Sequence, residues 1–268
     1  VRAYKHGSLQ YFVHVMILSK LRRGFFTIRS QGLERLQGAL EEDPTSVLFV
    51  ANHSSWWDFF MAHYLNTVIP IDGYGMTEDF NMRKFGFFRR VGAYSVDRSD
   101  PLAIRASIEY TVELLRLPRA GVWIFPQGKI VCNDVRPLDF QGGLRLIVRR
   151  AGRVRIVPTA FRYEFWQDER PEAFVRFGAP FYLDRHEVHH AIGICHALKA
   201  PPLPASIGRR VKPVGNEKLR VTKIGNQLFG HRVQVVSVRA EAMQQHHQRS
   251  RSPLPLGCNA QDSECFCW

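Results

Sequence analysis

This chain of 268 residues has no long hydrophobic run. A helix that spans a bilayer needs about 20 apolar residues, whereas the nearest candidate, residues 9–18, is too short. Basic side chains follow it at Lys20, Arg22 and Arg23. We therefore predict that residues 1–40 form an amphipathic helical segment that associates with a membrane surface. A helix packed into the protein core is the alternative interpretation.

Cysteine is also scarce. The chain has five cysteines, and neither they nor the 11 histidines follow the Cys/His spacing of a zinc site. We therefore expect no bound metal ion. Cys132 and Cys195 stand alone in the sequence, and no secretory signal is evident. Both features predict a reducing, cytoplasmic compartment.

Acidic residues are few compared with basic ones. The chain has 24 Asp and Glu against 37 Lys and Arg, which gives a formal net charge of +13. Such an excess attracts polyanions, either nucleic acid or an anionic membrane surface. No zinc-finger, helix-turn-helix or RNA-binding motif is present, and the basic residues are spread along the chain. We therefore predict no nucleic-acid partner and a peripheral position on the inner face of a membrane.

Strand-like and helix-like runs alternate through the middle of the chain. Strand-length apolar runs lie at residues 47–51, 92–96, 121–125, 155–161 and 173–177. Apolar residues recur at helical spacing over residues 55–65, 102–116 and 144–148. Hydrophobic residues make up 45% of the chain, enough for a sizeable core. The pattern predicts one layered α/β domain over residues 41–200.

The character of the sequence changes after a proline-rich boundary at residues 201–204. From there on, the chain has ten Lys or Arg residues and four Asp or Glu residues, and residues 244–253 are of low complexity. We predict that residues 201–268 form a basic, disordered tail. Within it, only residues 233–238 resemble a strand.

A histidine stands five residues before an aspartate, directly after the apolar run 47–51. His53 then lies where a strand ends, and Asp58 lies near the first turn of the next helix. A carboxylate there can hold one imidazole nitrogen and leave the other free to take a proton from a hydroxyl. A purely structural histidine is the alternative. We interpret Ser54 and Ser55 as helix caps, since no Gly-x-Ser-x-Gly elbow surrounds them.

Two later segments place cations after strand-like runs. The residues concerned are Arg98, Phe125, Pro126, Gln127, Gly128 and Lys129. Gly128 permits close approach of the backbone to a ligand. Lys129 and the forked guanidinium of Arg98 can bind phosphate oxygens. The alternative is that Arg98 pairs with a nearby acid and that Phe125 and Pro126 merely end a strand.

Four motifs occur in an order that resembles the lysophospholipid acyltransferase family, the glycerolipid acyltransferases that include 1-acylglycerol-3-phosphate acyltransferase. The first, Asn-His-x-x-x-x-Asp, is met by Asn52, His53 and Asp58. The others are Asp-Arg, Phe-Pro-Gln-Gly-Lys and Val-Pro-Thr-Ala, at residues 97–98, 125–129 and 157–160. The resemblance covers roughly residues 30–185. It implies an α/β fold with a mixed central sheet flanked by helices and an N-terminal helical segment.

The resemblance also implies a reaction. An acyl group would pass from a thioester of coenzyme A or acyl carrier protein to a hydroxyl of a lysophospholipid-like acceptor, lysophosphatidic acid by default. His53 would be the general base and Asp58 would orient it. Substrate would be bound by Asn52, Arg98 and residues 125–129. Neither an acyl-enzyme nor a resident cofactor would be required.

One departure from the family pattern concerns the acceptor. Gln127 stands where the family usually has Glu, and its neutral amide keeps a hydrogen bond but loses a charge. Another lysolipid or a glycosylated lipid therefore stays open as acceptor. Two other classes also stay open: a non-catalytic lipid-binding protein, which would not need His53 and Asp58, and a phosphate-directed hydrolase that uses water as its acceptor.

Overall fold

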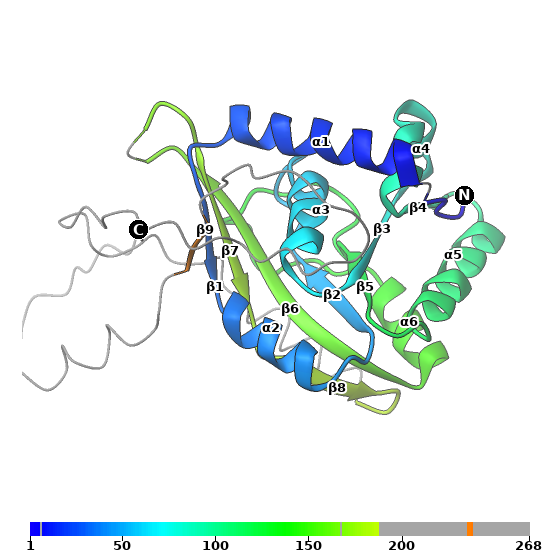
Figure 1. Ribbon diagram of the computed structural model, residues 1–268. Coiled ribbons are helices and arrows are strands. Elements are labelled where there is room, and N and C mark those ends of the chain that lie inside the picture. Colours follow the sequence, from blue (N-terminus) through cyan, green and yellow to red (C-terminus); the bar gives the residue numbers. More distant parts are fainter. Residues whose placement is uncertain (6, 167, 188–234, 238–268) are drawn as a thin grey trace, which may run out of the picture. The chain divides into compact units, whose positions relative to one another are not determined.

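The computed structural model describes residues 1–5, 7–166, 168–187 and 235–237. Its strands are β1 (Ile28–Gln31), β2 (Val47–Ala51), β3 (Asp72–Glu78), β4 (Ala93–Val96), β5 (Ala120–Ile124), β6 (Arg153–Glu164), β7 (Glu172–Phe177), β8 (Phe181–Asp184) and β9 (Val235–Ser237). They form one sheet in the order β4-β3-β5-β2-β6-β7-β1-β9 (Figure 1). The remaining strand, β8, pairs with the first residues of β6, 153–156, whereas β7 pairs with the last ones, 159–164.

The sheet is mixed. Strands β4, β3, β5, β2 and β6 are parallel neighbours, whereas β7 and β8 both run antiparallel to β6. Strands β2 and β5 are buried along their whole length, as expected for parallel strands that are covered on both faces. The predicted α/β fold with a mixed central sheet and an N-terminal helix is confirmed.

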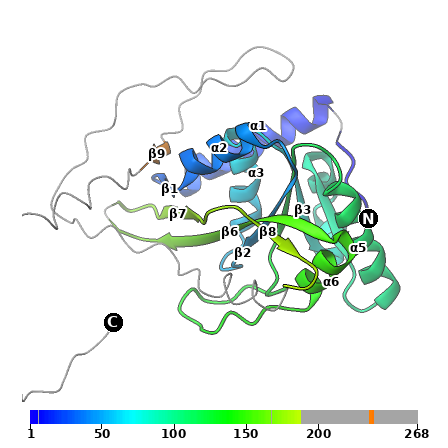
Figure 2. The ribbon, with the colours of Figure 1, turned by 90° about the horizontal axis from the view of Figure 1, so that it is seen from below.

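Helices cover both faces of the sheet. They are α1 (Gly7–Gly24), α2 (Leu33–Glu42), α3 (Asp58–Val68), α4 (Asp79–Lys84), α5 (Pro101–Leu114) and α6 (Gly143–Ala151), with a 3₁₀ turn η1 (Gly86–Val91). Alternate residues of β2 face opposite sides. Phe49 packs with α1, α2 and α3, whereas Leu48 and Val50 pack with α5 and α6. Figure 2 shows α1, α2 and α3 together on one side of the sheet.

Helix α1 packs on the domain with one face. Val13, Ile17 and Leu21, which recur every four residues, are buried in the core that α1 shares with α3. The opposite face exposes Tyr11 and Phe12. The interpretation of a helix packed into the core is thus confirmed for the buried face. Association with a membrane surface would use the exposed face and stays a prediction. None of the helices that the structure describes is long and apolar enough to cross a bilayer.

One prediction for the N-terminal segment needs correction. Residues 1–40 are not helical throughout, because residues 28–31 form β1, which pairs with β7. Most of the predicted tail lies outside the described residues. Its described part is β9, which falls within the strand predicted at residues 233–238.

Candidate active site

The motif loops meet at one edge of the sheet. Because β2, β3, β4 and β5 are parallel, their carboxyl ends lie at the same edge. The segments that follow the four strands therefore emerge at this edge. They are the His53 loop after Ala51, the segment after Glu78, the Arg98 loop after Val96, and the third motif, residues 125–129, after Ile124. Ligands of open α/β sheets bind at this kind of edge.

Asn52 fastens the first of these loops to β6. Its side-chain oxygen accepts a hydrogen bond from Phe161 N at 2.7 Å, and its amide donates to Phe161 O at 3.0 Å. The amide also donates to Asn133 Oδ1 at 3.2 Å. A side chain with both a donor and an acceptor is needed to satisfy both backbone groups of Phe161, which explains why asparagine precedes His53.

His53 and Asp58 contact each other directly. Their Nδ1 and Oδ2 atoms lie 2.7 Å apart. An ionised carboxylate can only accept hydrogen bonds, so Nδ1 carries the proton and Nε2 is left as the acceptor nitrogen. The Asp58 side chain is fully buried, whereas 26% of the His53 side chain is exposed. The pair therefore presents one basic nitrogen to a ligand.

The third motif supports the His53 loop from the other side. Gln127 is buried, and its Oε1 accepts a hydrogen bond from the backbone N–H of His53 at 2.7 Å. Val131 N donates to His53 O at 2.9 Å. Both backbone groups of His53 are thus held by the segment that follows β5. The Phe125 ring lies 4.9 Å from the His53 ring between centroids.

Arg98 and Gly128 meet across the site. Gly128 has φ +64°, a left-handed conformation that favours glycine. Its carbonyl oxygen accepts a hydrogen bond from Arg98 Nη1 at 2.7 Å, and the same nitrogen donates to Glu78 Oε1 at 2.9 Å. Arg98 Nη2 lies 3.5 Å from Gln141 Oε1. The alternative that Arg98 pairs with a nearby acid is confirmed for Glu78.

A cavity of about 640 Å³ opens beside these residues. Its polar wall includes His53, Glu78, Arg98, Lys129 and Gln141. Its apolar walls come from both faces of the sheet, with phenylalanines on one side and aliphatic side chains on the other: Phe59, Phe60, Phe85, Phe88, Phe125, Ile104, Ile108, Leu144 and Ile147. An apolar cavity with a few polar groups at its mouth fits an amphiphilic ligand.

The structure separates the predicted substrate-binding residues into two groups. Arg98, Phe125, Pro126, Gly128 and Lys129 line the cavity. Asn52 and Gln127 do not, because their side chains bond the backbone of Phe161 and of His53 respectively. The neutral amide at position 127 therefore acts on the shape of the His53 loop.

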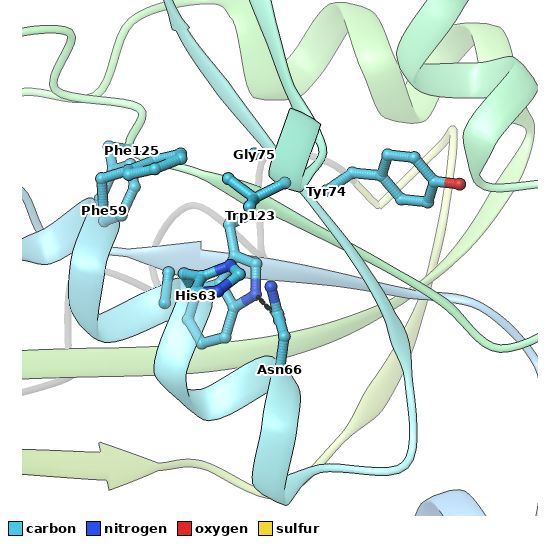
Figure 3. Close-up of a pocket in the computed structure, with 9 residues that line it drawn as sticks. Phe59, His63, Asn66, Tyr74, Gly75, Trp123 and Phe125 are labelled. Carbon is cyan, nitrogen blue, oxygen red and sulfur yellow. Dashed lines mark hydrogen bonds between the residues drawn. The ribbon is translucent and has the colours of Figure 1, made fainter. Parts of the chain in front are cut away.

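A much smaller void lies behind the site, between α3, β3 and β5 (Figure 3). Its volume is about 10 Å³, room for about one water molecule. Asn66 Oδ1 accepts a hydrogen bond from Trp123 Nε1 there at 2.7 Å, the bond drawn in Figure 3. Phe59 and Phe125 line this void as well as the large cavity. The void is a gap in the packing beneath the site.

Sequence reasoning missed Tyr163, whose hydroxyl donates to Asp58 Oδ1 at 2.7 Å. Tyr163 lies on β6, more than 100 positions after Asp58, and nothing in its local sequence distinguishes it from other strand tyrosines.

In the described part of the chain, no group of three or more His, Cys, Asp or Glu side chains is arranged to hold a metal ion.

Comparison with known families agrees with this geometry. A model of the acyltransferase family matches residues 27–162, just over half of the chain, from β1 to the part of β6 that carries Phe161. The match spans the motif loops that meet at the edge of the sheet. A comparison with curated proteins gives no match. The extent of the family match shows that this chain belongs to the acyltransferase family, whose reaction is acyl transfer.

Proposed function

We propose that this acyltransferase moves a fatty acyl group from acyl-CoA or acyl carrier protein to a hydroxyl of a lysophospholipid-like acceptor, such as 1-acylglycerol-3-phosphate. The observation that carries the proposal is the His53–Asp58 pair, in which Asp58 holds Nδ1 and His53 lines the cavity that opens beside Arg98 and Lys129. The acyl thioester is a co-substrate, and the proposed reaction uses no resident cofactor.

In the proposed reaction, His53 Nε2 removes the proton of the acceptor hydroxyl while the hydroxyl oxygen attacks the thioester carbonyl carbon. Asp58 stabilises the imidazolium that forms, because its carboxylate lies on the opposite ring nitrogen. The tetrahedral intermediate then breaks its carbon–sulfur bond. The imidazolium returns the proton to the leaving thiolate, so that ester and thiol are the two products and His53 is neutral again.

The cavity supports an acceptor with a phosphate and an acyl chain. Lys129 lines it, is exposed, and has no ion-pair partner among the residues described. Arg98 also lines the cavity. Its Nη1 is held by Glu78 and Gly128, which leaves Nη2, 3.5 Å from Gln141 Oε1, as the nitrogen to donate to a phosphate oxygen. The buried side chains Ile108, Leu144 and Ile147 give the apolar wall that an acyl chain needs. About 0.8 kcal/mol is gained for each methylene buried.

A radiolabelled acyl thioester offered with a panel of lysolipids tests the proposal. We expect label to enter the phosphate-bearing lysolipid, and His53→Ala to lower the rate by about 10²–10⁴-fold, the usual contribution of general-base catalysis. His186→Ala, which changes an exposed histidine, is the matched control. Release of free fatty acid without any acceptor would favour the hydrolase. Lipid binding without turnover by folded protein would favour the non-catalytic protein.

We further propose that the protein works on the cytoplasmic, inner face of an anionic membrane. The outer face of α1 supports this, because Tyr11, Phe12 and Val15 are exposed on it while Arg22 and Arg23 close its last turn. An apolar face bordered by basic residues suits the interface between headgroups and acyl chains. A lipid acceptor could then reach the cavity without leaving the bilayer.

A further inference from the structure

Asp58 has more hydrogen-bond partners than orienting one imidazole requires. Its Oδ2 accepts hydrogen bonds from His53 Nδ1 at 2.7 Å, from Ser54 N at 2.8 Å and from Ser55 N at 3.0 Å. All three donors belong to the local loop. Its other oxygen, Oδ1, accepts from the Tyr163 hydroxyl at 2.7 Å. Among the described residues, Tyr163 is the only partner of that oxygen.

The tyrosine acts on the site from a different element. Tyr163 lies near the end of β6. The centroid of its ring is 5.5 Å from that of Phe25, the residue that follows the end of α1. The hydroxyl therefore ties the start of α3 to the central sheet. A carboxylate held at Oδ2 alone can still rotate about its last bond, whereas a donor at each oxygen fixes its plane.

Tyr163 also stays a donor under all ordinary conditions. Burial of the phenol and the adjacent charge of Asp58 raise the pKa of Tyr163 well above its usual range. A phenol that cannot ionise donates its proton to Asp58 throughout the working pH range, and such a hydrogen bond to an ion is stronger than one between neutral groups. Part of the negative charge of Asp58 is thereby offset by Tyr163.

We infer that Tyr163 is a positioning residue for the proposed base, whose hydroxyl fixes the plane of the Asp58 carboxylate and sets how much negative charge that carboxylate presents to His53. This inference rests on the proposed function and deepens it. Tyr163 does not line the cavity, so its effect on the reaction passes through Asp58.

Tyr163→Phe tests the inference, because it removes the hydroxyl and keeps the ring. We expect kcat to fall about tenfold, the effect of losing one hydrogen bond to a charged group, while KM is unchanged. The acid limb of the kcat–pH profile should move to higher pH, since a carboxylate with one donor fewer attracts the imidazolium more strongly.

Tyr94→Phe is the matched control. The Tyr94 hydroxyl is buried and lies 2.7 Å from Thr111 Oγ1, in the core on the other face of the sheet. Both variants lose one hydroxyl hydrogen bond of equal length. We expect both to remain folded by circular dichroism and thermal unfolding, and only Tyr163→Phe to change kcat and the pH profile. Equal kinetics in the two variants would overturn the inference.

A readout without turnover separates this inference from the proposed function. The proton on His53 Nδ1 gives an NMR signal that is assigned by its loss in His53→Ala. We expect Tyr163→Phe to shift this signal and Tyr94→Phe to leave it in place. An unmoved signal in Tyr163→Phe overturns the positioning role. A shifted signal in a protein that transfers no acyl group upholds the Tyr163–Asp58–His53 coupling and refutes the proposed reaction.

Discussion

His14 Nδ1 lies 3.1 Å from His63 Nε2, and this contact joins α1 to α3. Burial lowers the pKa of both rings, and it lowers that of His63 to about 3, with smaller contributions from His14 and Lys5. The pair is therefore neutral at pH 7, with one ring donating its N–H to the other. The charged group that acts on the His63 ring is the ammonium of Lys5, which donates a hydrogen bond to Asp72.

This pair predicts a loss of stability in mild acid. The pKa of His63 is about 3 in the folded protein, below the ordinary value of 6.5. At pH values between these two, the unfolded chain therefore binds more protons than the folded protein. The free energy of unfolding must then fall as pH drops below about 6.5 toward 3. We expect His63→Gln, which cannot titrate, to reduce the slope measured by urea unfolding between pH 7.5 and 4.5.

The control is His186→Gln, since His186 is exposed and its replacement should leave the pH dependence unchanged. The range stops at pH 4.5 because carboxylates titrate below it and would add their own slope. If His63→Gln and the unmodified protein showed the same slope, the burial of a neutral His63 would be refuted.

Gln127 predicts a contrast between two substitutions. Gln127→Glu keeps an oxygen that can accept the His53 N–H, and we expect its kcat to stay within about threefold of the original, since the loop is still held. Gln127→Ala leaves that N–H without its partner, which costs about 1–3 kcal/mol, and kcat should fall at least about tenfold. Steady-state kinetics of both variants check this, and equal losses would contradict it.

Gly128 predicts a change in binding of the proposed phosphate-bearing acceptor. A Cβ at this position would lie 3.0 Å from Arg98 Nη1 and would sit on a backbone with φ +64°. We expect Gly128→Ala to destabilise the fold by about 1 kcal/mol and to raise KM for the acceptor severalfold by displacing the guanidinium. Thermal unfolding and substrate titration measure the two effects.

Gly38→Ala is the control for that experiment. Gly38 lies in α2, and a Cβ there meets nothing within 4 Å. Alanine favours a helix over glycine by roughly 0.5–1 kcal/mol, so this variant should be slightly more stable, with an unchanged KM. A Gly128→Ala protein that kept its KM would show that Arg98 does not depend on the small size of position 128.

The outer face of α1 predicts selective binding to anionic vesicles. Phe12 is 65% exposed on that face, and Leu117, which follows α5 on the opposite side of the sheet, is 46% exposed. We expect Phe12→Glu to weaken binding to vesicles with anionic lipid, because it places a charge in the apolar face. Leu117→Glu should have little effect in the same sedimentation assay. Equal weakening by both substitutions would argue against docking through α1.

Strand and helix assignments from the sequence were best where buried apolar runs were long. β2 begins and ends where it was predicted, at residues 47–51. β3 was missed, because Gly73 and Gly75 interrupt its pattern and its pairing with β4 and β5 stabilises it instead. α3 begins at Asp58, after the serines that were expected to cap it. The Asp58 carboxylate binds the backbone N–H groups of those serines.

What the sequence by itself determined is local. The apolar run 47–51 and the five-residue step from His53 to Asp58 suffice to place an imidazole and a carboxylate within reach, because a short loop and one helical turn separate them. Tertiary structure alone decided which distant groups complete the site. Tyr163, Gln127 and Glu78 reach it because long-range strand pairing places β6 and β5 on either side of β2 and β3 next to β5. Such pairing depends on packing of the whole sheet, which no short segment encodes.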